Sequence, residues 1–220
     1  IRCGRPHLPT STSVSEIRMY TLYEYPPSGN CYKARLLMHQ LRLRFERVTV
    51  DTQANETRTP EFLLLNPNGK VPTLKLPNGE VLAESNAMLW YLADATPFLP
   101  DTRLQRAQVL HWMFFEQYSH EPFIATLRNW ISYANKRDEF ASEIEAFRPK
   151  GYAALDVMEQ HLESRTYLVG ESYSIADIAL YAYTHVAHEG EFDLGNYIAI
   201  CKWLRRIEKE PRHIAIDWRE

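Results

Sequence analysis

Hydrophobic residues in the first third of the chain alternate between strand-like and helix-like spacing. Short apolar stretches rich in Tyr, Thr, Val and Leu predict β-strands at residues 19–25, 45–50, 73–76 and 80–82. Three further segments have apolar positions at helical spacing: 31–41, 61–65 and the residues from 85 onward. This order, β-α-β-α-β-β-α, predicts one mixed sheet with helices packed on it.

The strand-like alternation ends at the proline-containing segment 95–100, which we interpret as a linker. Beyond it only helical spacing remains, so we expect an α/β domain at residues 19–97 and an all-helical domain at 98–220. Pro122 is expected to kink or break one long helix, and Pro149 to interrupt another. A serine and an aspartate at 174 and 177 have the spacing of a capping box, which predicts a further helix start.

Composition narrows the classes of function. The 220 residues carry a net charge of −3, which gives no electrostatic reason to expect a nucleic-acid partner. No apolar run approaches the roughly 20 residues that a membrane-spanning helix needs, so we expect no membrane association. Three distant cysteines suit neither a disulfide framework nor a cysteine-rich metal site, which favours a cytoplasmic location. Residues 1–18 lack an apolar signal-peptide core, and we interpret them as a disordered leader or a non-native extension.

The most informative motif is the segment 66–74, with sequence NPNGKVPTL, followed by Glu84 and Ser85. A proline just before a strand is a candidate for a cis bond, since the amide before proline loses only about 0.5–1 kcal/mol in the cis form. Such a bond would turn the backbone N–H and C=O of Val71 outward, toward an extended peptide. Ser85, at a predicted helix start, offers its hydroxyl and free N–H groups to a carboxylate. The pair predicts a site for a small peptide with a free carboxylate at one end.

A second motif, Ser28-Gly29-Asn30-Cys31, connects the first predicted strand to the first predicted helix. The helix N-terminus there presents unpaired N–H groups and a partial positive charge, which acidify a thiol. Relative to a Cys-x-x-Cys redox motif, the first cysteine is replaced by Ser28, so the dithiol couple is lost. The Ser28 hydroxyl could stabilise the thiolate of a bound ligand. Alternatively, Ser28 and Asn30 could serve only as caps of the helix.

Taken together, these motifs resemble the cytosolic glutathione S-transferase family, in its bacterial type with a serine- or asparagine-like active site. The resemblance runs from Met19 to about Pro211 and includes the Pro-Pro-Ser-x-x-Cys turn, the Val-Pro segment, the Glu-Ser pair and the capping box. It implies an N-terminal thioredoxin-like domain, βαβαββα, followed by a helical bundle domain. It also implies a homodimer, and an enzyme that uses glutathione as co-substrate, without a metal, to attack a small hydrophobic electrophile.

The resemblance assigns the glutathione-binding roles to five residues. Val71 would hydrogen-bond the backbone of the cysteinyl residue, with Pro72 in the cis form. Glu84 and Ser85 would hold the amine and carboxylate of the γ-glutamyl end. Lys70, beside the same loop, would meet the glycyl carboxylate.

For the contact with the sulfur, the resemblance ranks Ser28 first, Asn30 second and Tyr25 third. Cys31 is expected to be buried and inert. Aromatic residues of the first long helix are candidates for the pocket of the hydrophobic substrate, although such stripes usually pack helices together. These candidates are Trp112, Phe115, Tyr118 and Phe123.

Two alternatives remain from the sequence. The chain could reduce disulfides or peroxides through bound glutathione, which the residues around Asn30 and Cys31 leave open. It could also be a non-catalytic module that uses the same fold for protein contacts. Against the second alternative, a module that no longer binds glutathione has no physical reason to keep both the Val-Pro and the Glu-Ser motif.

Overall fold

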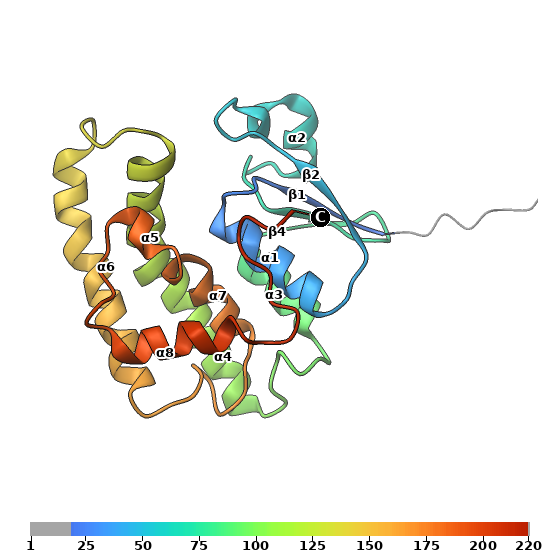
Figure 1. The fold of residues 1–220 in the computed structure, drawn as a ribbon. Coiled ribbons are helices and arrows are strands. Elements are labelled where there is room, and N and C mark those ends of the chain that lie inside the picture. The colour runs from blue at the N-terminus through green and yellow to red at the C-terminus, as the bar shows by residue number, and fades with distance from the viewer. Residues whose placement is uncertain (1–18, 220) are drawn as a thin grey trace, which may run out of the picture.

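A four-stranded mixed sheet forms the N-terminal part of the computed structural model, which describes residues 19–219 (Figure 1). The expectation for residues 1–18 lies outside this range. The strand order is β2-β1-β3-β4, with β1 parallel to β2 and antiparallel to β3, and β3 antiparallel to β4. The strands are β1 (Tyr20–Glu24), β2 (Phe45–Thr49), β3 (Thr73–Lys75) and β4 (Val81–Ala83). All of these strands were predicted, and their ends differ from the predicted ones by at most one residue.

Three helices accompany the sheet: α1 (Gly29–Gln40), α2 (Pro60–Leu65) and α3 (Ser85–Ala93). Helices α1 and α3 contact each other, and α1 also packs against α7 (Ile175–Thr184) of the helical part. Because α1 is covered by α3 and by α7 of the helical part, every residue from Cys31 to Met38 is buried, including Lys33 and Arg35. Burial of two cations at the interface requires that each has an anionic partner.

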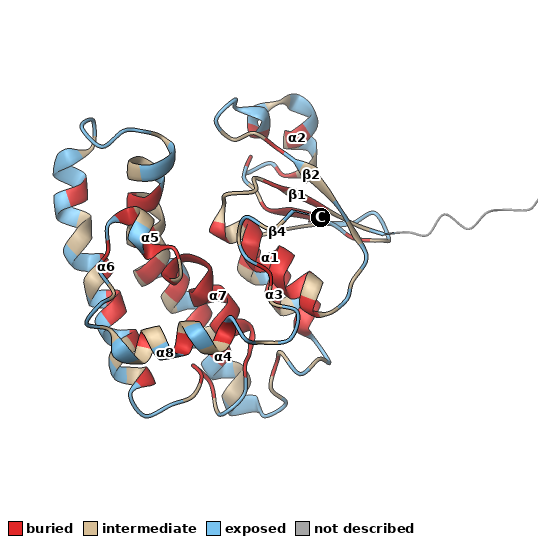
Figure 2. Ribbon diagram, viewed as in Figure 1, coloured by how far each residue is buried: buried red, intermediate tan, exposed pale blue. Residues whose placement is uncertain are grey.

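The remaining chain is helical, as predicted. It comprises α4 (Arg103–Phe115), a π-helical segment (Glu116–His120), α5 (Glu121–Arg128), a second π-helical segment (Asn129–Tyr133), α6 (Ala141–Leu162), α7 and α8 (Ile198–Ile207). Buried residues concentrate along α1 and α7 (Figure 2). No helix within residues 19–219 combines the length and the apolar character needed to cross a membrane.

The predicted capping box at the start of α7 is confirmed. The Asp177 carboxylate accepts a hydrogen bond of 3.0 Å from the backbone N–H of Ser174. It also accepts from the backbone N–H of Leu168 at 3.0 Å and from the indole of Trp203 at 2.9 Å. This buried carboxylate therefore joins three segments of the helical domain, which exceeds the local capping role that the sequence predicted.

The two proline predictions had different outcomes. Pro122 lies in the first turn of α5, where the chain stays helical, but the π-helical segment directly before it interrupts the regular α-helix. The predicted interruption at Pro149 is wrong, because α6 continues through it. A proline inside a helix removes one backbone hydrogen bond. In α6, burial of Ile144 before Pro149 and of Leu155 after it compensates for that loss.

Candidate functional site

Two adjoining cavities lie where the N-terminal end of α1 faces the helical domain. The Ser28 cavity has a volume of about 320 Å³ and is bordered by Ser28 and Tyr25 on one side and by Arg128 and Tyr133 on the other. The Ser85 cavity, of about 70 Å³, is lined by Asn30, Glu84, Ser85, Gln117 and Glu121, among others. Lys70 and Val71 line both cavities. The two cavities together can therefore receive one extended ligand that passes along Val71.

Ser28 both caps α1 and faces the Ser28 cavity. Its backbone is extended, and its hydroxyl oxygen accepts a hydrogen bond of 3.4 Å from the N–H of Cys31. Since the cap uses the oxygen as an acceptor, the hydroxyl hydrogen can still be donated to a ligand. The capping role and the functional role that the sequence suggested are thus compatible in this geometry.

Asn30 lines the Ser85 cavity, whereas Ser28 lines the neighbouring one. Its side-chain amide donates to Glu121 Oε1 at 2.7 Å, and its carbonyl oxygen accepts from Lys33 Nζ at 2.7 Å and from Ser85 Oγ at 3.1 Å. The structure therefore places this side chain beside Ser85, engaged on both its oxygen and its nitrogen.

Tyr25 and Cys31 lie on either side of Ser28 in the chain. Tyr25 lines the Ser28 cavity, and its backbone N–H donates to the sulfur of Cys31 at 3.3 Å. Cys31 is completely buried, and burial raises the pKa of its thiol to about 12. The thiol is thus protonated and covered at neutral pH, which makes it a poor nucleophile.

The segment before β3 is held in shape by an asparagine. The side-chain amide of Asn66 donates to the backbone oxygen of Lys70 at 2.8 Å and to Thr73 Oγ1 at 3.1 Å. The peptide bond between Val71 and Pro72 is cis. These contacts fix the turn that brings Lys70 and Val71 to the border of both cavities.

Glu84 and Ser85 meet at the start of α3. Glu84 has a φ of 66°, in the region that favours glycine, and Ser85 is the first residue of the helix. A non-glycine residue in such a conformation costs on the order of 1–3 kcal/mol, and such strain clusters at binding sites. Both residues line the Ser85 cavity, as a role in binding the end of a ligand requires.

The aromatic residues expected to form a substrate pocket lie elsewhere. Trp112 is buried and packs edge-on against Phe115 and His161, with ring centroids 5.3 and 4.6 Å apart. Tyr118 is 85% exposed. None of the four predicted residues, Phe123 included, lines the Ser28 or the Ser85 cavity. The helical domain instead presents Ala125, Arg128, Asn129, Tyr133 and Tyr183 to the Ser28 cavity.

Comparison with family models gives two matches that cover most of the described chain. Residues 27–95 match "Glutathione S-transferase, N-terminal domain", and residues 113–211 match "Glutathione S-transferase, C-terminal domain". The chain belongs to the glutathione S-transferase family. The predicted fold class, a thioredoxin-like domain followed by a helical domain, is confirmed.

The relatives of this glutathione S-transferase family member include both an oxidoreductase and glutathione transferases. A disulfide-bond oxidoreductase of Escherichia coli, YfcG, is 31% identical over 200 residues, covering 88% of this chain and 92% of that protein. A glutathione S-transferase structure from Pseudomonas fluorescens is 50% identical, with a TM-score of 0.88, covering 90% and 98%. A glutathione transferase structure from Pseudomonas putida, with glutathione disulfide bound, is 26% identical, with a TM-score of 0.79, covering 91% of each chain.

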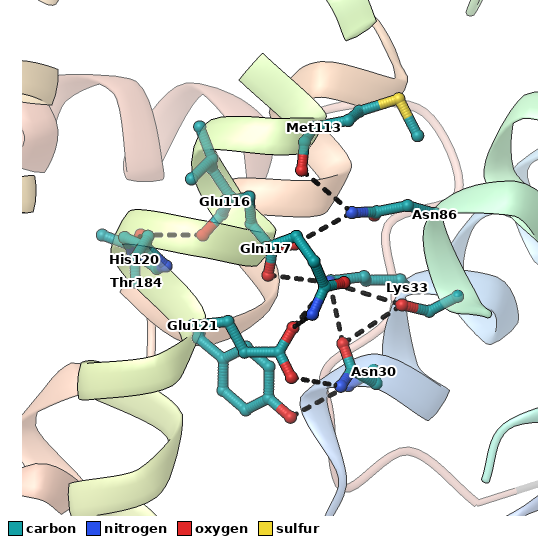
Figure 3. A network of polar contacts seen from close by, with 12 residues as sticks. Asn30, Lys33, Asn86, Met113, Glu116, Gln117, His120, Glu121 and Thr184 are labelled. Carbon is teal, nitrogen blue, oxygen red and sulfur yellow. Dashed lines mark hydrogen bonds and ion pairs between the residues drawn. The ribbon is translucent and has the colours of Figure 1, made fainter. Parts of the chain in front are cut away.

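In this family member, sequence reasoning missed a buried polar network beside the Ser85 cavity (Figure 3). Lys33 Nζ lies 2.8 Å from Glu116 Oε1, and both side chains are completely buried. Glu116 also accepts from Asn86 Nδ2 at 3.0 Å, and burial raises the pKa of its carboxyl to about 7. The one available signal was a lysine in a helix whose flanking residues are mostly apolar.

Arg128 was also missed. It is 4% exposed, lines the Ser28 cavity, and donates to Glu189 Oε2 at 2.9 Å and to the Tyr133 hydroxyl at 2.7 Å. The guanidinium brings a positive charge to the helical wall of the cavity, which the paired carboxylate of Glu189 partly offsets. Within residues 19–219, no group of three or more His, Cys, Asp or Glu side chains is arranged to hold a metal ion.

Proposed function

We propose that this protein binds glutathione across the two cavities and activates its thiol. The γ-glutamyl end would occupy the Ser85 cavity, the cysteinyl backbone would meet Val71, and the glycyl carboxylate would lie near Lys70. The observation that carries this proposal is that Lys70 and Val71 line both cavities, while Ser28 opens onto one and Ser85 onto the other. A tripeptide is about 10 Å long when extended, which suits a site made of two neighbouring cavities.

The sulfur would then lie near Ser28, at the N-terminus of α1. A free thiol has a pKa of about 8.5, and lowering it by about two units requires about 2.7 kcal/mol. A helix terminus supplies about 0.3–1 kcal/mol, or up to about 2 when partly buried, so the helix alone falls short. One hydrogen bond to a charged acceptor adds about 1.5–3 kcal/mol. The Ser28 hydroxyl, together with the helix terminus, therefore suffices to ionise the thiol near neutral pH.

The thiolate would attack a second substrate in the Ser28 cavity. In the conjugation that the family resemblance implies, the sulfur forms a bond to carbon of a small electrophile, whose leaving group departs with the bonding electrons. Tyr25, Ala125, Tyr133 and Tyr183 offer such a substrate apolar ring and methyl surface.

A second reaction, reduction of disulfides, is favoured by the charge of the same cavity. Arg128 and Lys70 both line it, so a ligand with carboxylates is complementary to it. The thiolate of glutathione would attack one sulfur of a disulfide, form a mixed disulfide and release the other sulfur as a thiolate. A second glutathione would resolve the mixed disulfide and leave as glutathione disulfide. The oxidoreductase name of YfcG and the disulfide bound to the Pseudomonas putida protein support this reaction.

Thiolate absorbance of glutathione tests the shared step. The titration, from about pH 5 to 9, is compared with and without stoichiometric protein, and then with Ser28→Ala. A midpoint well below that of the free thiol, restored toward it by Ser28→Ala, is the expected result. Binding without a shift would refute thiol activation. The turnover rates of two substrates then separate the two reactions: a small aryl halide reports conjugation, and a glutathione mixed disulfide reports disulfide reduction.

We also propose that the protein forms a homodimer. Large apolar side chains are exposed on α3 and α4 and just beyond α4: Tyr91 is 49% exposed, Leu104 and Phe114 are each 69% exposed, and Tyr118 is 85% exposed. Exposed apolar surface of this kind marks interaction sites. Light scattering on a sizing column should give twice the mass of the chain, and a monomer at all concentrations would refute the dimer.

A further inference from the structure

The buried network beside the Ser85 cavity joins the two domains of one chain. Lys33 of α1 contacts Glu116 at 2.8 Å and Asn30 at 2.7 Å (Figure 3). It also lies 3.5 Å from Ser85 Oγ. Its distance to Glu121 Oε2 is longer, at 3.8 Å. One ammonium group thus faces two carboxylates, and it is closer to the fully buried one. Glu121 remains without a cation at hydrogen-bond distance among residues 19–219.

Glu121 is placed at the wall of the cavity by neutral donors. Asn30 Nδ2 donates to its Oε1 at 2.7 Å, and Gln117 Nε2 donates to its Oε2 at 3.2 Å. Its side chain is 17% exposed and lines the Ser85 cavity. Two amides therefore fix the orientation of a carboxylate, one face of which borders the cavity where the γ-glutamyl end is proposed to bind.

We propose that Glu121 binds the γ-glutamyl ammonium of glutathione and so determines the preference for a ligand with a free amino group. This inference rests on the proposed function. The helical domain would then recognise the amine while Ser85, at the N-terminus of α3, holds the carboxylate of the same γ-glutamyl group. A bound ammonium would add a second positive charge beside Glu121, whose ion pair with Lys33 is long, at 3.8 Å.

Glu84 is the competing carboxylate, because it lines the same cavity. It is exposed to solvent, whereas Glu121 is largely covered. Ion pairs that are exposed contribute little, since water screens them, and pairs at partly buried groups are stronger. The orientation of Glu121 by two amides also reduces the entropy lost on binding. These differences favour Glu121 as the partner of the amine.

The test compares two ligands that differ only in the amino group. Binding of glutathione and of N-glutaryl-cysteinylglycine, which lacks that group, is measured by calorimetry with the full chain and with Glu121→Gln. The unsubstituted protein should bind glutathione about tenfold more tightly than the analogue, equivalent to about 1.4 kcal/mol. Glu121→Gln should lose this preference, with weaker binding of glutathione and nearly unchanged binding of the analogue. Glutamine keeps an acceptor oxygen for Asn30, and its new N–H group can donate to Gln117 once the Gln117 amide turns over to present its oxygen.

Glu84→Gln is the matched control, with the same chemical change in the same cavity. The proposal predicts that it retains most of the preference for the amino group. Equal weakening of both ligands by Glu121→Gln would overturn the proposal, because a structural role affects both alike. Loss of the preference in Glu84→Gln, or no preference in the unsubstituted protein, would also overturn it while leaving glutathione binding intact. Failure of the unsubstituted protein to bind either ligand would instead refute the proposed function itself. If Glu121→Gln does not fold, Glu121→Asp takes its place, and the affinities of the two ligands are compared between this variant and the unsubstituted protein.

Discussion

The guanidinium of Arg128 donates a hydrogen bond of 2.7 Å to the backbone oxygen of Pro27, the residue two positions before Gly29 and directly before Ser28. This bond crosses from the helical domain to the loop that leads into α1. The same guanidinium donates to Glu189 and to Tyr133, whose hydroxyl donates in turn to Glu189 Oε2 at 2.9 Å. The position of the proposed catalytic hydroxyl therefore depends on a side chain of the other domain.

Arg128→Gln should lower both stability and thiol activation. The variant leaves the carbonyl of Pro27 and the carboxylate of Glu189 without their charged donor, and an unsatisfied buried group costs about 1–3 kcal/mol. It also removes a positive charge from the Ser28 cavity, so the thiol pKa of bound glutathione should rise. Urea unfolding measures the first effect, and thiolate absorbance measures the second.

Arg137→Gln is the control for this prediction. Arg137 pairs with Glu191 on the surface, where its side chain is 54% exposed. Exposed pairs contribute at most about 1 kcal/mol, so this variant should behave almost like the unsubstituted protein. If Arg128→Gln also left the thiol titration unchanged, the link between Arg128 and the active site would be wrong.

Ser28→Ala should raise the thiol pKa of bound glutathione and reduce turnover near neutral pH. Loss of one hydrogen bond to a thiolate corresponds to about 1.5–3 kcal/mol, or roughly one to two pKa units. Loss of the cap should cost a further ~1 kcal/mol of folding stability. Ser28→Thr keeps both the hydroxyl and the cap, so it should restore both properties. A pH–rate profile separates the loss of thiolate from a loss of fold, because the activity of the alanine variant should recover at high pH.

His120 should make the protein sensitive to acid. Its Nε2 lies 2.9 Å from Thr184 Oγ1, whose own hydrogen is donated to the backbone of Leu180, so Nε2 carries the ring proton. Nδ1 has no hydrogen-bond partner within residues 19–219, and burial together with the nearby Lys33 charge lowers the pKa of the ring to about 3. The unfolded chain binds a proton near pH 6.5, whereas the folded chain does not until about pH 3.

The sign of the effect follows from this difference. Between about pH 6.5 and 3 the unfolded state binds more protons, so stability falls by up to about 1.4 kcal/mol for each unit of acidification. His120→Gln, which does not titrate, should show a flatter decline. Urea unfolding at several pH values checks this prediction, and an equal decline in both proteins would contradict it.

Local signals in the sequence predicted the fold well. Alternation, turn residues and the capping box each involve residues close together in the chain, so the strands of the sheet and the start of α7 could be located. The same holds for the Val-Pro and Glu-Ser motifs, whose backbone conformations are set by neighbouring residues.

The polar contacts of the site could not be predicted, because their partners are far apart in the sequence. Lys33 and Glu116 are separated by 83 residues, and Arg128 and Pro27 by 101. Which charges meet across a domain interface depends on the packing of α1 against the helical domain, and no local pattern encodes it. Asn30 illustrates the consequence, since its side chain contacts the helical domain through Glu121.

The aromatic residues that line neither cavity need a different explanation. The expected pocket assumed that one regular helix continues through Trp112, Phe115 and Tyr118. The helix becomes π-helical at Glu116–His120, and a π-helical turn changes the register of all side chains that follow. Tyr118 lies within that segment and is exposed, while the earlier Trp112 keeps its place in the core.

Gly29 should be required for the approach of α1 to α7. A Cβ at this position would lie 2.6 Å from the Tyr183 ring and 2.9 Å from the backbone oxygen of Ala182. Gly29→Ala must therefore push the N-terminus of α1 away from α7. Overpacking of this kind lowers the free energy of unfolding by about 1–3 kcal/mol. Because Asn30 donates its backbone N–H to the Tyr183 hydroxyl at 3.3 Å, the shift should also disturb the residues beside Ser28.

Gly79→Asn is the comparison for that variant. Gly79 has a φ of 93°, and a Cβ there would meet nothing within 4 Å, so its substitution tests backbone strain without a clash. Asparagine tolerates positive φ better than most residues, so the loss of stability should be small. Glutathione affinity should be unchanged in Gly79→Asn and weakened in Gly29→Ala. Normal affinity and stability in Gly29→Ala would mean that the packing of α1 on α7 does not fix the position of Ser28. The hydrogen bond from Arg128 to Pro27 would then be the contact that holds this loop.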